Sequence, residues 1–197
     1  MVYMVWATIG GLMTPHMFHE HQKDRLVGSE RRSFQPAEGI VTRSGAMKGS
    51  RIADLGCGNG YISVPLAELG AEVVAIDTQR EMLVDLVRRS GAVGGNVRPV
   101  LASLPDIPLR DGAVDHVFLV NMFHEMTEKK HMVDECRRIL RQGGRLTLVD
   151  FQKRPTVMGP PMEERIPEDE VASWFTGFSV EGKASLPEFY QFEFVRD

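Results

Sequence analysis

Three glycines at alternate positions are the residues of this sequence with the clearest chemical use. Gly56, Gly58 and Gly60 directly follow a short apolar stretch that contains Asp54 and ends at Leu55. Glycine permits a tight turn and lets a ligand lie against bare backbone N–H groups at the start of a following helix. We therefore expect a ligand to bind at this loop.

The residues around the loop indicate which ligand it binds. Dinucleotide sites place a third glycine three residues after the second, and Tyr61 occupies that position. Asp54 would repel a pyrophosphate but attract the ammonium and sulfonium groups of S-adenosylmethionine. Asp77 ends the next predicted strand, where its carboxylate can accept hydrogen bonds from both ribose hydroxyls. These residues favour S-adenosylmethionine as the cofactor.

Strands and helices are predicted to alternate around these residues along the chain. From Ser50 onward, short β-branched runs alternate with amphipathic stretches of helical period, which is typical of a parallel sheet. Five strands are predicted, at residues 51–55, 72–77, 97–101, 114–120 and 145–150. The carboxyl ends of such strands meet at one edge of the sheet, where ligands bind.

Two helices are marked by capping residues and periodicity. Thr78 and Glu81 predict a capping box at the start of the first helix, and Gly91 predicts its end. Its predicted buried stripe consists of Met82, Leu83, Leu86 and Val87. The second helix is predicted over about residues 128–141, with Gly143 just past its end.

The end of the chain follows a different pattern. A proline-rich connection at residues 154–167 leads to a short helix, which should begin at Pro167 and end at Gly177. Two strands are predicted after it. In the last one, aromatic and polar residues alternate at 190–194, which predicts one buried face. The residues before Ser50 are predicted to form one or two helices.

With this loop and this order of elements, the chain resembles the class I S-adenosylmethionine-dependent methyltransferases of the small single-domain type. The resemblance covers about residues 51–177. It implies a Rossmann-like α/β fold, with a doubly wound seven-stranded sheet that is mostly parallel, an antiparallel last strand, and helices on both faces. It also implies an N-terminal helical segment, residues 1–49, as a lid over the active site, and a cofactor-binding methyltransferase domain at residues 50–197.

The resemblance assigns a part of S-adenosylmethionine to each residue along the binding edge. The assigned residues are Asp54, Gly56, Cys57 and Gly58 for the methionine end, Asp77 for the ribose, Thr78 and Met82 for one side of the adenine, Ser103 and Leu104 for the adenine edge, and Asn121 beside them. The sequence departs from the family at one of these positions, because an acidic residue is common where Ser103 stands.

Three polar residues follow the fourth predicted strand on the ligand side of the sheet. We expect Asn121, His124 and Glu125 to face the methyl acceptor as catalytic residues. Methyl transfer is an in-line displacement in which the protein aligns the acceptor and excludes water. A base is needed only if the acceptor starts protonated. His124 is the preferred base, because imidazole accepts a proton near neutral pH; the alternative is a histidine that only bonds to backbone.

The first residues of the chain carry two weaker signals. Residues 1–14 are apolar, but they lack a basic start and a cleavage site and are too few to span a bilayer. We expect neither a signal peptide nor an anchor, and a later start of translation is one hypothesis. His16, His19 and His21 are close in sequence, but no cysteine accompanies them. Histidines in solvent or in a lid are favoured, so no metal is expected.

Charge and missing motifs restrict the partners. The chain has 23 basic and 27 acidic residues, a net charge of −4, and so lacks the positive excess that attracts nucleic acid or anionic lipid. Asn121 is followed by Met-Phe-His, not by the Pro-Pro-aromatic motif of enzymes that methylate flipped bases. A small-molecule acceptor is expected, with no nucleic acid and no membrane. By analogy, Phe18, Arg31 or Arg32 lines its cavity.

The predicted function is therefore methyl transfer from S-adenosylmethionine to a small molecule. The two cysteines lie far apart in sequence, which suits a reduced, cytoplasmic protein. Two alternatives stay open: a non-catalytic protein that binds S-adenosylmethionine or S-adenosylhomocysteine, and, with less support, an NAD-dependent oxidoreductase. The acceptor atom and the oligomeric state are not determined by these residues.

Overall fold

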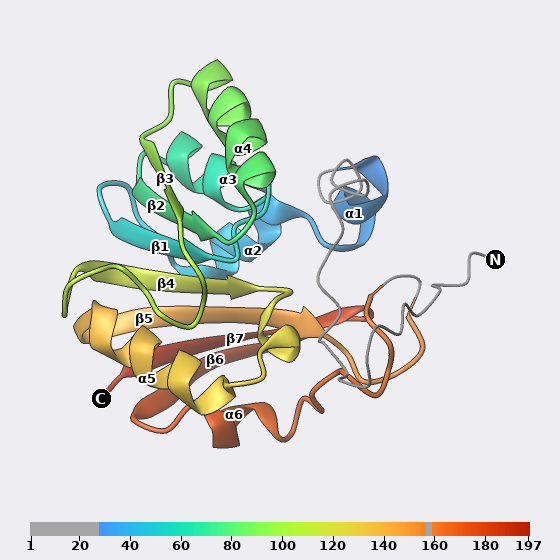
Figure 1. Cartoon of the computed structure of the whole chain (residues 1–197). Helices are drawn as coiled ribbons and strands as arrows, with labels where there is room; N and C mark the ends of the chain where they lie inside the picture. The colour runs from blue at the N-terminus through green and yellow to red at the C-terminus, as the bar shows by residue number, and fades with distance from the viewer. Residues whose placement is uncertain (1–27, 157–158) are drawn as a thin grey trace, which may run out of the picture.

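The chain folds around one seven-stranded sheet, as the computed structural model describes it for residues 28–156 and 159–197 (Figure 1). The strands are β1 (Arg51–Leu55), β2 (Glu72–Asp77), β3 (Val97–Leu101), β4 (Val114–Val120), β5 (Leu140–Phe151), β6 (Phe178–Ser185) and β7 (Phe189–Arg196). Their order in the sheet is β3-β2-β1-β4-β5-β7-β6. Strands β1 to β5 are parallel, and β7 is antiparallel to both of its neighbours. The predicted Rossmann-like fold is confirmed.

Helices cover both faces of this sheet (Figure 1). They are α1 (Ser29–Phe34), α2 (Ala37–Ser44), α3 (Ser63–Glu68), α4 (Arg80–Ala92), the 3-10 turn η2 (Phe123–Glu125), α5 (Lys129–Ile139) and α6 (Val171–Trp174). One core cluster joins α5 and α6 to the sheet, and a second joins α2, α3 and α4 to the opposite face. Within residues 28–49 the structure has the helices α1 and α2, where one or two helices were predicted before Ser50. None of the helices in the described ranges is long and apolar enough to span a membrane.

The start of α4 differs from its prediction. The helix begins one residue after Gln79, and no side chain caps its first turn. Instead, the carboxylate of Asp77 accepts a hydrogen bond from the Gln79 backbone N–H at 2.8 Å. The capping box of Thr78 and Glu81 is therefore wrong, because the aspartate that ends β2 forms the turn before the helix.

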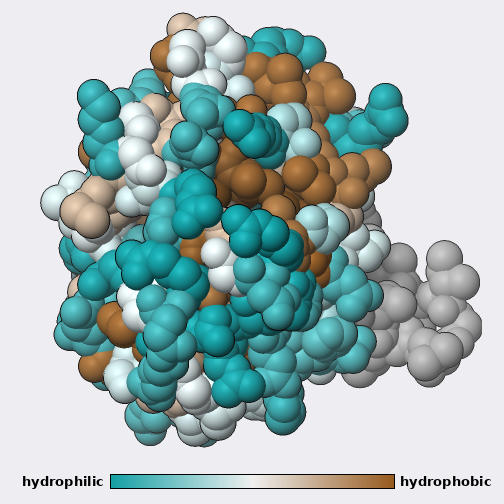
Figure 2. All heavy atoms as spheres, turned by 90° about the vertical axis from the view of Figure 1, so that its left-hand side faces the viewer, coloured by the Kyte–Doolittle hydropathy of each residue, from teal (hydrophilic) through white to brown (hydrophobic). Residues whose placement is uncertain are grey.

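Three helix boundaries and the burial of one residue also differ from their predictions. Val87 is 50% exposed because α4 packs at the β3 edge of the sheet, and Gly91 lies inside the helix. Exposed apolar side chains gather in the upper half of Figure 2, the side of the molecule where Figure 1 shows α4 and β3. The next helix ends early because Leu140 pairs with β4 as the first residue of β5. A turn at Pro167 delays α6 until Val171.

The last strand is buried on both faces, so the prediction of one buried face is wrong. Because β5 and β6 flank β7 and α2 covers its second face, Gln191 and Glu193 are buried as well as the aromatic residues. These polar groups are paired. Arg43 donates to Gln191 at 2.8 Å, and Glu193 accepts hydrogen bonds from Gln191 and Thr147 at 2.6 Å each.

Candidate functional site

The carboxyl edge of the sheet brings the predicted residues together where the strand order reverses. Asp54 lies near the end of β1, Asp77 ends β2, Asn121 follows β4, and Asp150 lies near the end of β5. The chain leaves β1 toward one side of the sheet and β4 toward the other. In open α/β sheets this arrangement leaves a crevice that binds ligands.

The glycine loop takes a conformation that its residue types require. Gly56 and Gly60 have φ angles of 68° and 86°, which larger residues rarely adopt. A Cβ atom at Gly60 would lie 2.3 Å from Cδ1 of Leu86, and one at Gly56 would lie 3.2 Å from the Met122 side chain. The loop therefore packs against α4 on one side and against the end of β4 on the other, at a distance that only glycine permits.

Asp77 ties the glycine loop to β2. One carboxylate oxygen accepts a hydrogen bond from the Gly58 N–H at 2.8 Å, and the other accepts one from the Gln79 N–H at 2.8 Å. The residue is 7% exposed, and burial raises the pKa of its carboxyl group. Because each carboxylate oxygen can accept a second hydrogen bond, Asp77 is oriented by the backbone and can still bind hydroxyl groups of a ligand.

Asp54 is a buried carboxylate. It is 2% exposed, and the Ser63 hydroxyl donates a hydrogen bond to it at 2.5 Å. Burial raises the pKa of Asp54 to about 7; the charge of Asp77 adds to this rise, while Ser63 and the charge of Arg31 oppose it. A cationic ligand group would stabilise the ionised form. The surroundings of Asp54 thus favour a positively charged ligand.

The other residues expected around the cofactor have different exposures. Cys57 is buried, and burial raises the pKa of its thiol well above the ordinary value, so it packs and does not react as a thiolate. Met82 is buried in α4, whereas Thr78 is exposed beside Asp77. Their contacts with adenine stay predictions.

The segment after β3 lies beside Asp77. The Ala102 N–H donates a hydrogen bond to the Asp77 carbonyl oxygen at 3.1 Å. Ser103 is exposed, and Leu104 is half-buried against the core cluster of α5. The position of this segment is compatible with the predicted adenine edge, and its contacts with a cofactor also stay predictions.

His124 and Asp150 form a buried pair on the other half of the edge. Nδ1 of His124 lies 2.6 Å from Oδ1 of Asp150, and the His124 backbone N–H donates to Oδ2 at 3.1 Å. Both side chains are buried. An acceptor on Nδ1 places a proton there, so Nε2 is left as the basic nitrogen of the neutral ring. Sequence reasoning selected His124 and missed Asp150, whose only signal was its place at a strand end.

Acidic groups raise the basicity of this imidazole. Burial alone would lower the pKa of His124, but the charge and hydrogen bond of Asp150, with the charges of Glu125 and Glu164, raise it. Nε2 of His124 lies 3.7 Å from Oε1 of Glu125. Burial raises the pKa of Glu125 to about 7, and Asp150 and Asp77 add to that rise. The imidazole therefore lies between two carboxyl groups.

Asn121 joins this edge to the N-terminal segment. Among the residues that the structure describes, it is the only non-glycine residue with a left-handed backbone, at φ 56°. Its side-chain amide donates to Oε1 of Gln35 at 2.8 Å and accepts from Nε2 of Gln35 at 3.0 Å. The amide is thus engaged by a residue between α1 and α2, which no motif of the sequence indicated.

Arg31 of α1 lies in the same contact. Its guanidinium carbon is 3.8 Å from the centroid of the Tyr61 ring, and its Nε donates to Gln35 at 3.0 Å. The Tyr61 hydroxyl donates to the Gln35 carbonyl oxygen at 2.5 Å. The first helix is therefore attached to the residue that follows the glycine loop. Arg32, its neighbour, is exposed.

The remaining predictions concern residues elsewhere. His16, His19, His21, Phe18 and the apolar start at 1–14 lie outside the described residues. Within the described ranges, no group of three or more His, Cys, Asp or Glu residues is arranged to hold a metal ion.

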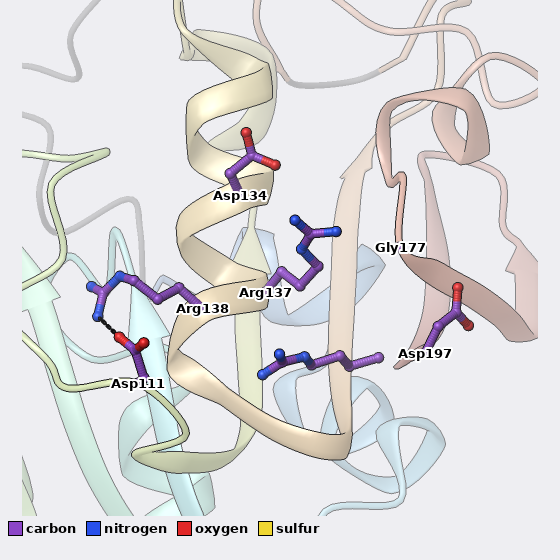
Figure 3. A pocket seen from close by; sticks show the side chains of 7 residues that line it. Asp111, Asp134, Arg137, Arg138, Gly177 and Asp197 are labelled. Carbon is purple, nitrogen blue, oxygen red and sulfur yellow. Dashed lines mark hydrogen bonds and ion pairs between the residues drawn. The ribbon is translucent and has the colours of Figure 1, made fainter.

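A hollow of about 370 Å³ lies at the opposite end of β5 and β7, where α5 ends (Figure 3). Its lining consists of Asp111, Asp134, Arg137, Arg138, Gly177, Arg196 and Asp197. Arg138 is paired there with Asp111 at 3.0 Å. None of the predicted site residues contributes to this hollow, and it is open surface between charged side chains.

Comparison with known proteins agrees with the geometry. Residues 53–148 match a family described as a methyltransferase domain. The chain is 36% identical over 107 residues to a demethylmenaquinone methyltransferase of Clavibacter sepedonicus, covering 54% of this chain and 43% of that protein. It is 32% identical over 111 residues to a ubiquinone biosynthesis O-methyltransferase of Xanthomonas oryzae pv. oryzae, covering 55% and 46%. The chain thus spans less than half the length of these relatives.

Two solved structures are similar over most of the chain. A SAM-dependent methyltransferase from Aquifex aeolicus has a TM-score of 0.85 at 25% identity, over 92% of this chain and 100% of that one. A putative type 11 methyltransferase from Sulfolobus solfataricus has a TM-score of 0.70 at 29% identity, over 83% and 93%.

Proposed function

Because the chain belongs to the class I S-adenosylmethionine-dependent methyltransferases, we propose that it transfers the methyl group of this cofactor to a small-molecule acceptor. S-adenosylmethionine is the cofactor of the family, and when bound it supplies a methyl group on a sulfonium. The observation that carries the proposal is the buried pair of His124 and Asp150 on the same edge as Asp54 and Asp77.

The residues of β1 and β2 suit this cofactor. Asp54 lies in surroundings that favour a cation, which suits the methionine ammonium, and Asp77 can accept hydrogen bonds from the ribose hydroxyls. Gly56 and Gly58 let a ligand approach the backbone. The remaining residues that we propose for the cofactor are Cys57, Thr78, Met82, Ser103, Leu104 and Asn121.

The residues of β4 and β5 suit an acceptor that must lose a proton. We assign His124 as the base: its Nε2 would take the proton of the acceptor, while the bound cofactor would give up its methyl group and leave as S-adenosylhomocysteine. Asp150 is a positioning residue, because it holds the proton on Nδ1 and stabilises the imidazolium that forms. Glu125 lies on the Nε2 side, where it can orient the acceptor.

The names of the relatives support a small molecule as acceptor. One is named for demethylmenaquinone and the other for ubiquinone biosynthesis, and both names refer to small molecules. The net charge of −4 agrees with an acceptor other than nucleic acid. An acceptor with a weakly acidic hydroxyl group would also explain why the edge carries a base.

We extend the proposal to the N-terminal segment and to the location of the protein. The contact of Gln35 with Asn121 supports residues 1–49 as a segment that covers the site of the domain at 50–197. Cys57 and Cys136 are free and buried, which supports a reduced, cytoplasmic environment.

The test is turnover with purified full chain. The protein is incubated with S-adenosylmethionine and a panel of small aromatic hydroxyl compounds that includes reduced quinones, and S-adenosylhomocysteine is measured. We expect its formation to depend on one class of acceptor and to be strongly slowed in His124→Ala. Tight S-adenosylhomocysteine binding without turnover on any acceptor would favour the non-catalytic alternative. Calorimetric binding of NAD in place of S-adenosylmethionine would favour the oxidoreductase.

A further inference from the structure

The backbone of Asn121 has a conformation that must be held by its surroundings. Its φ angle of 56° is the only left-handed one among the non-glycine residues that the structure describes. Asparagine enters this region more readily than most residues, but a side chain persists there only with support from its neighbours. The Asn121 N–H still donates to the Val149 carbonyl oxygen of β5 at 2.8 Å. The chain therefore leaves the sheet here, and the left-handed turn sets its new direction.

Gln35 supplies that support. It is fully buried at the end of α1, and its amide accepts from the Asn121 amide at 2.8 Å and donates to it at 3.0 Å. Nε of Arg31 donates to the same Gln35 oxygen at 3.0 Å, and a guanidinium only donates, so the orientation of this amide is fixed. The Tyr61 hydroxyl donates to the Gln35 carbonyl oxygen at 2.5 Å. Gln35 is thus held on three sides and gives the Asn121 amide one favourable position.

The turn that begins at Asn121 carries His124 to Asp150. His124 follows three residues later in η2, which is closed by a hydrogen bond from the Glu125 N–H to the Met122 carbonyl oxygen at 3.1 Å. Both the ring and the backbone N–H of His124 contact the Asp150 carboxylate, at 2.6 and 3.1 Å. Because the connection is short and closed, a change of direction at Asn121 would move both contacts together.

We propose that Gln35 is a positioning residue for methyl transfer: it holds Asn121 in the left-handed conformation, and this conformation sets His124 against Asp150. The inference rests on the proposed function, because it concerns the base assigned there. Gln35 acts through two other residues and contacts no reacting atom. The docking of the N-terminal segment thereby decides whether the imidazole is oriented to take a proton.

Loss of the Gln35 amide should lower turnover. A residue with a side chain disfavours the left-handed region by a factor of about 5 to 30 when nothing holds it there. Gln35→Met keeps the length of the side chain and removes its hydrogen bonds to Asn121. The fraction of molecules with an oriented His124 should fall, so we expect kcat to fall by about 5- to 30-fold. Gln142→Met is the matched control, because Gln142 is exposed near the amino end of β5, and its kcat should be that of the wild type.

The deciding experiment observes His124 directly and needs no acceptor. Nitrogen-15 NMR of the full chain, at a pH where the ring is neutral, shows which ring nitrogen carries the proton. In the wild type we expect the proton on Nδ1, because Asp150 accepts there. In Gln35→Met we expect a mixture of the two ring forms. The His116 ring should stay unchanged, because its Nε2 lies 2.8 Å from the Thr147 hydroxyl within the sheet, and it reports that the sheet is folded.

Two variants of Asn121 separate its backbone from its side chain. Asn121→Ala and Asn121→Gly both remove the amide, but only glycine adopts a φ of 56° freely. Asn121→Gly should therefore keep the proton on Nδ1 of His124, and Asn121→Ala should lose it. In the Asn121→Gly background, Gln35→Met should have no further effect on the His124 ring, because the backbone no longer has to be held.

Three results would overturn the inference. An unchanged His124 ring in Gln35→Met shows that its pairing with Asp150 does not depend on Gln35. Loss of the Nδ1 proton in both Asn121 variants shows that the backbone conformation is not what acts. An effect of Gln35→Met that persists in the Asn121→Gly background shows a general role in packing.

The remaining outcomes are also decisive. If Gln35→Met does not fold, the two Asn121 variants decide whether the left-handed backbone orients His124. If the wild type shows the Nδ1 proton but methylates no acceptor, the proposed function fails, while the role of Gln35 is still judged from the His124 ring. The two failures are therefore distinguishable.

Discussion

The two halves of the carboxyl edge hold their charged groups by different means. In the half formed by β1 and β2, Asp77 accepts from the backbone N–H groups of Gly58 and Gln79, which are 19 and 2 residues away. Asp54 accepts from Ser63, nine residues further on. These contacts lie within one strand-loop-helix-strand unit, and two of the three donors are backbone groups.

The half formed by β4 and β5 depends on contacts between distant segments. His124 and Asp150 are 26 residues apart, and Asn121 is 86 residues from Gln35. All four contribute side chains to these pairs. The register of β4 on β5 and the docking of the N-terminal segment therefore decide this half.

The carboxyl edge of the sheet thus divides two tasks between its halves. The half made of backbone contacts suits a cofactor that the whole family shares, and the half made of side-chain pairs suits an acceptor that varies among relatives. Variants of the first half should therefore change cofactor affinity, and variants of the second half should change turnover and its pH dependence.

The largest expected effect is that of His124→Ala. Removal of the base should lower kcat by about 10²- to 10⁴-fold, the usual contribution of general-base catalysis, with unchanged affinity for S-adenosylhomocysteine. Single-turnover kinetics and calorimetry measure the two quantities. His131→Ala serves as the control, because that side chain is 45% exposed on α5. Unchanged turnover in His124→Ala would remove this residue from the mechanism.

Asp150→Asn should lower turnover less and move the pH profile. We expect a loss of about 10- to 100-fold, because the carboxylate orients the imidazole ring and raises its basicity. The neutral imidazole is the active form, so activity rises with pH through a pKa that Asp150 holds above 6.5. Loss of the carboxylate lowers this pKa, and the acidic limb should shift to lower pH. A limb at the same pH in the variant would contradict the pairing.

Asp77→Ala should act on the half of the carboxyl edge that β1 and β2 form. The loss of a charged acceptor for the ribose should weaken S-adenosylhomocysteine binding by about 10- to 50-fold, while the acidic limb of kcat stays where it is in the wild type. Calorimetry and a pH series measure both. Asp169→Ala, at an exposed position, is the control. Wild-type affinity in Asp77→Ala would show that the ribose assignment is wrong.

Gly60→Ala should act on the stability of the fold. The added Cβ meets Leu86 at 2.3 Å at a φ of 86°, so we expect a loss of about 2 kcal/mol in the free energy of unfolding. Gly91→Ala is the matched control: it lies inside α4 with open space around it and should gain up to about 1 kcal/mol. Urea denaturation compares them, and equal stability would show that the loop tolerates side chains.

Much of the first half could be predicted because its contacts are local. Alternating glycines and two strand-end aspartates are close in sequence, and their chemistry depends on a strand followed by a turn and a helix. The same locality explains the confirmed strands. One local prediction was wrong, because Asp77 competed with Thr78 for the turn before α4.

The fold class, the glycine loop and the charges of Asp54 and Asp77 could be predicted from residue types and their spacing along the chain. The folded chain was needed to show that Asp150 holds His124, that Gln35 holds Asn121, and that Gln191 and Glu193 are buried. The physical reason is that a residue's type and its near neighbours set its backbone preference and its charge. Which distant side chain it pairs with depends on strand register and helix docking, and these follow from the packing of the whole core.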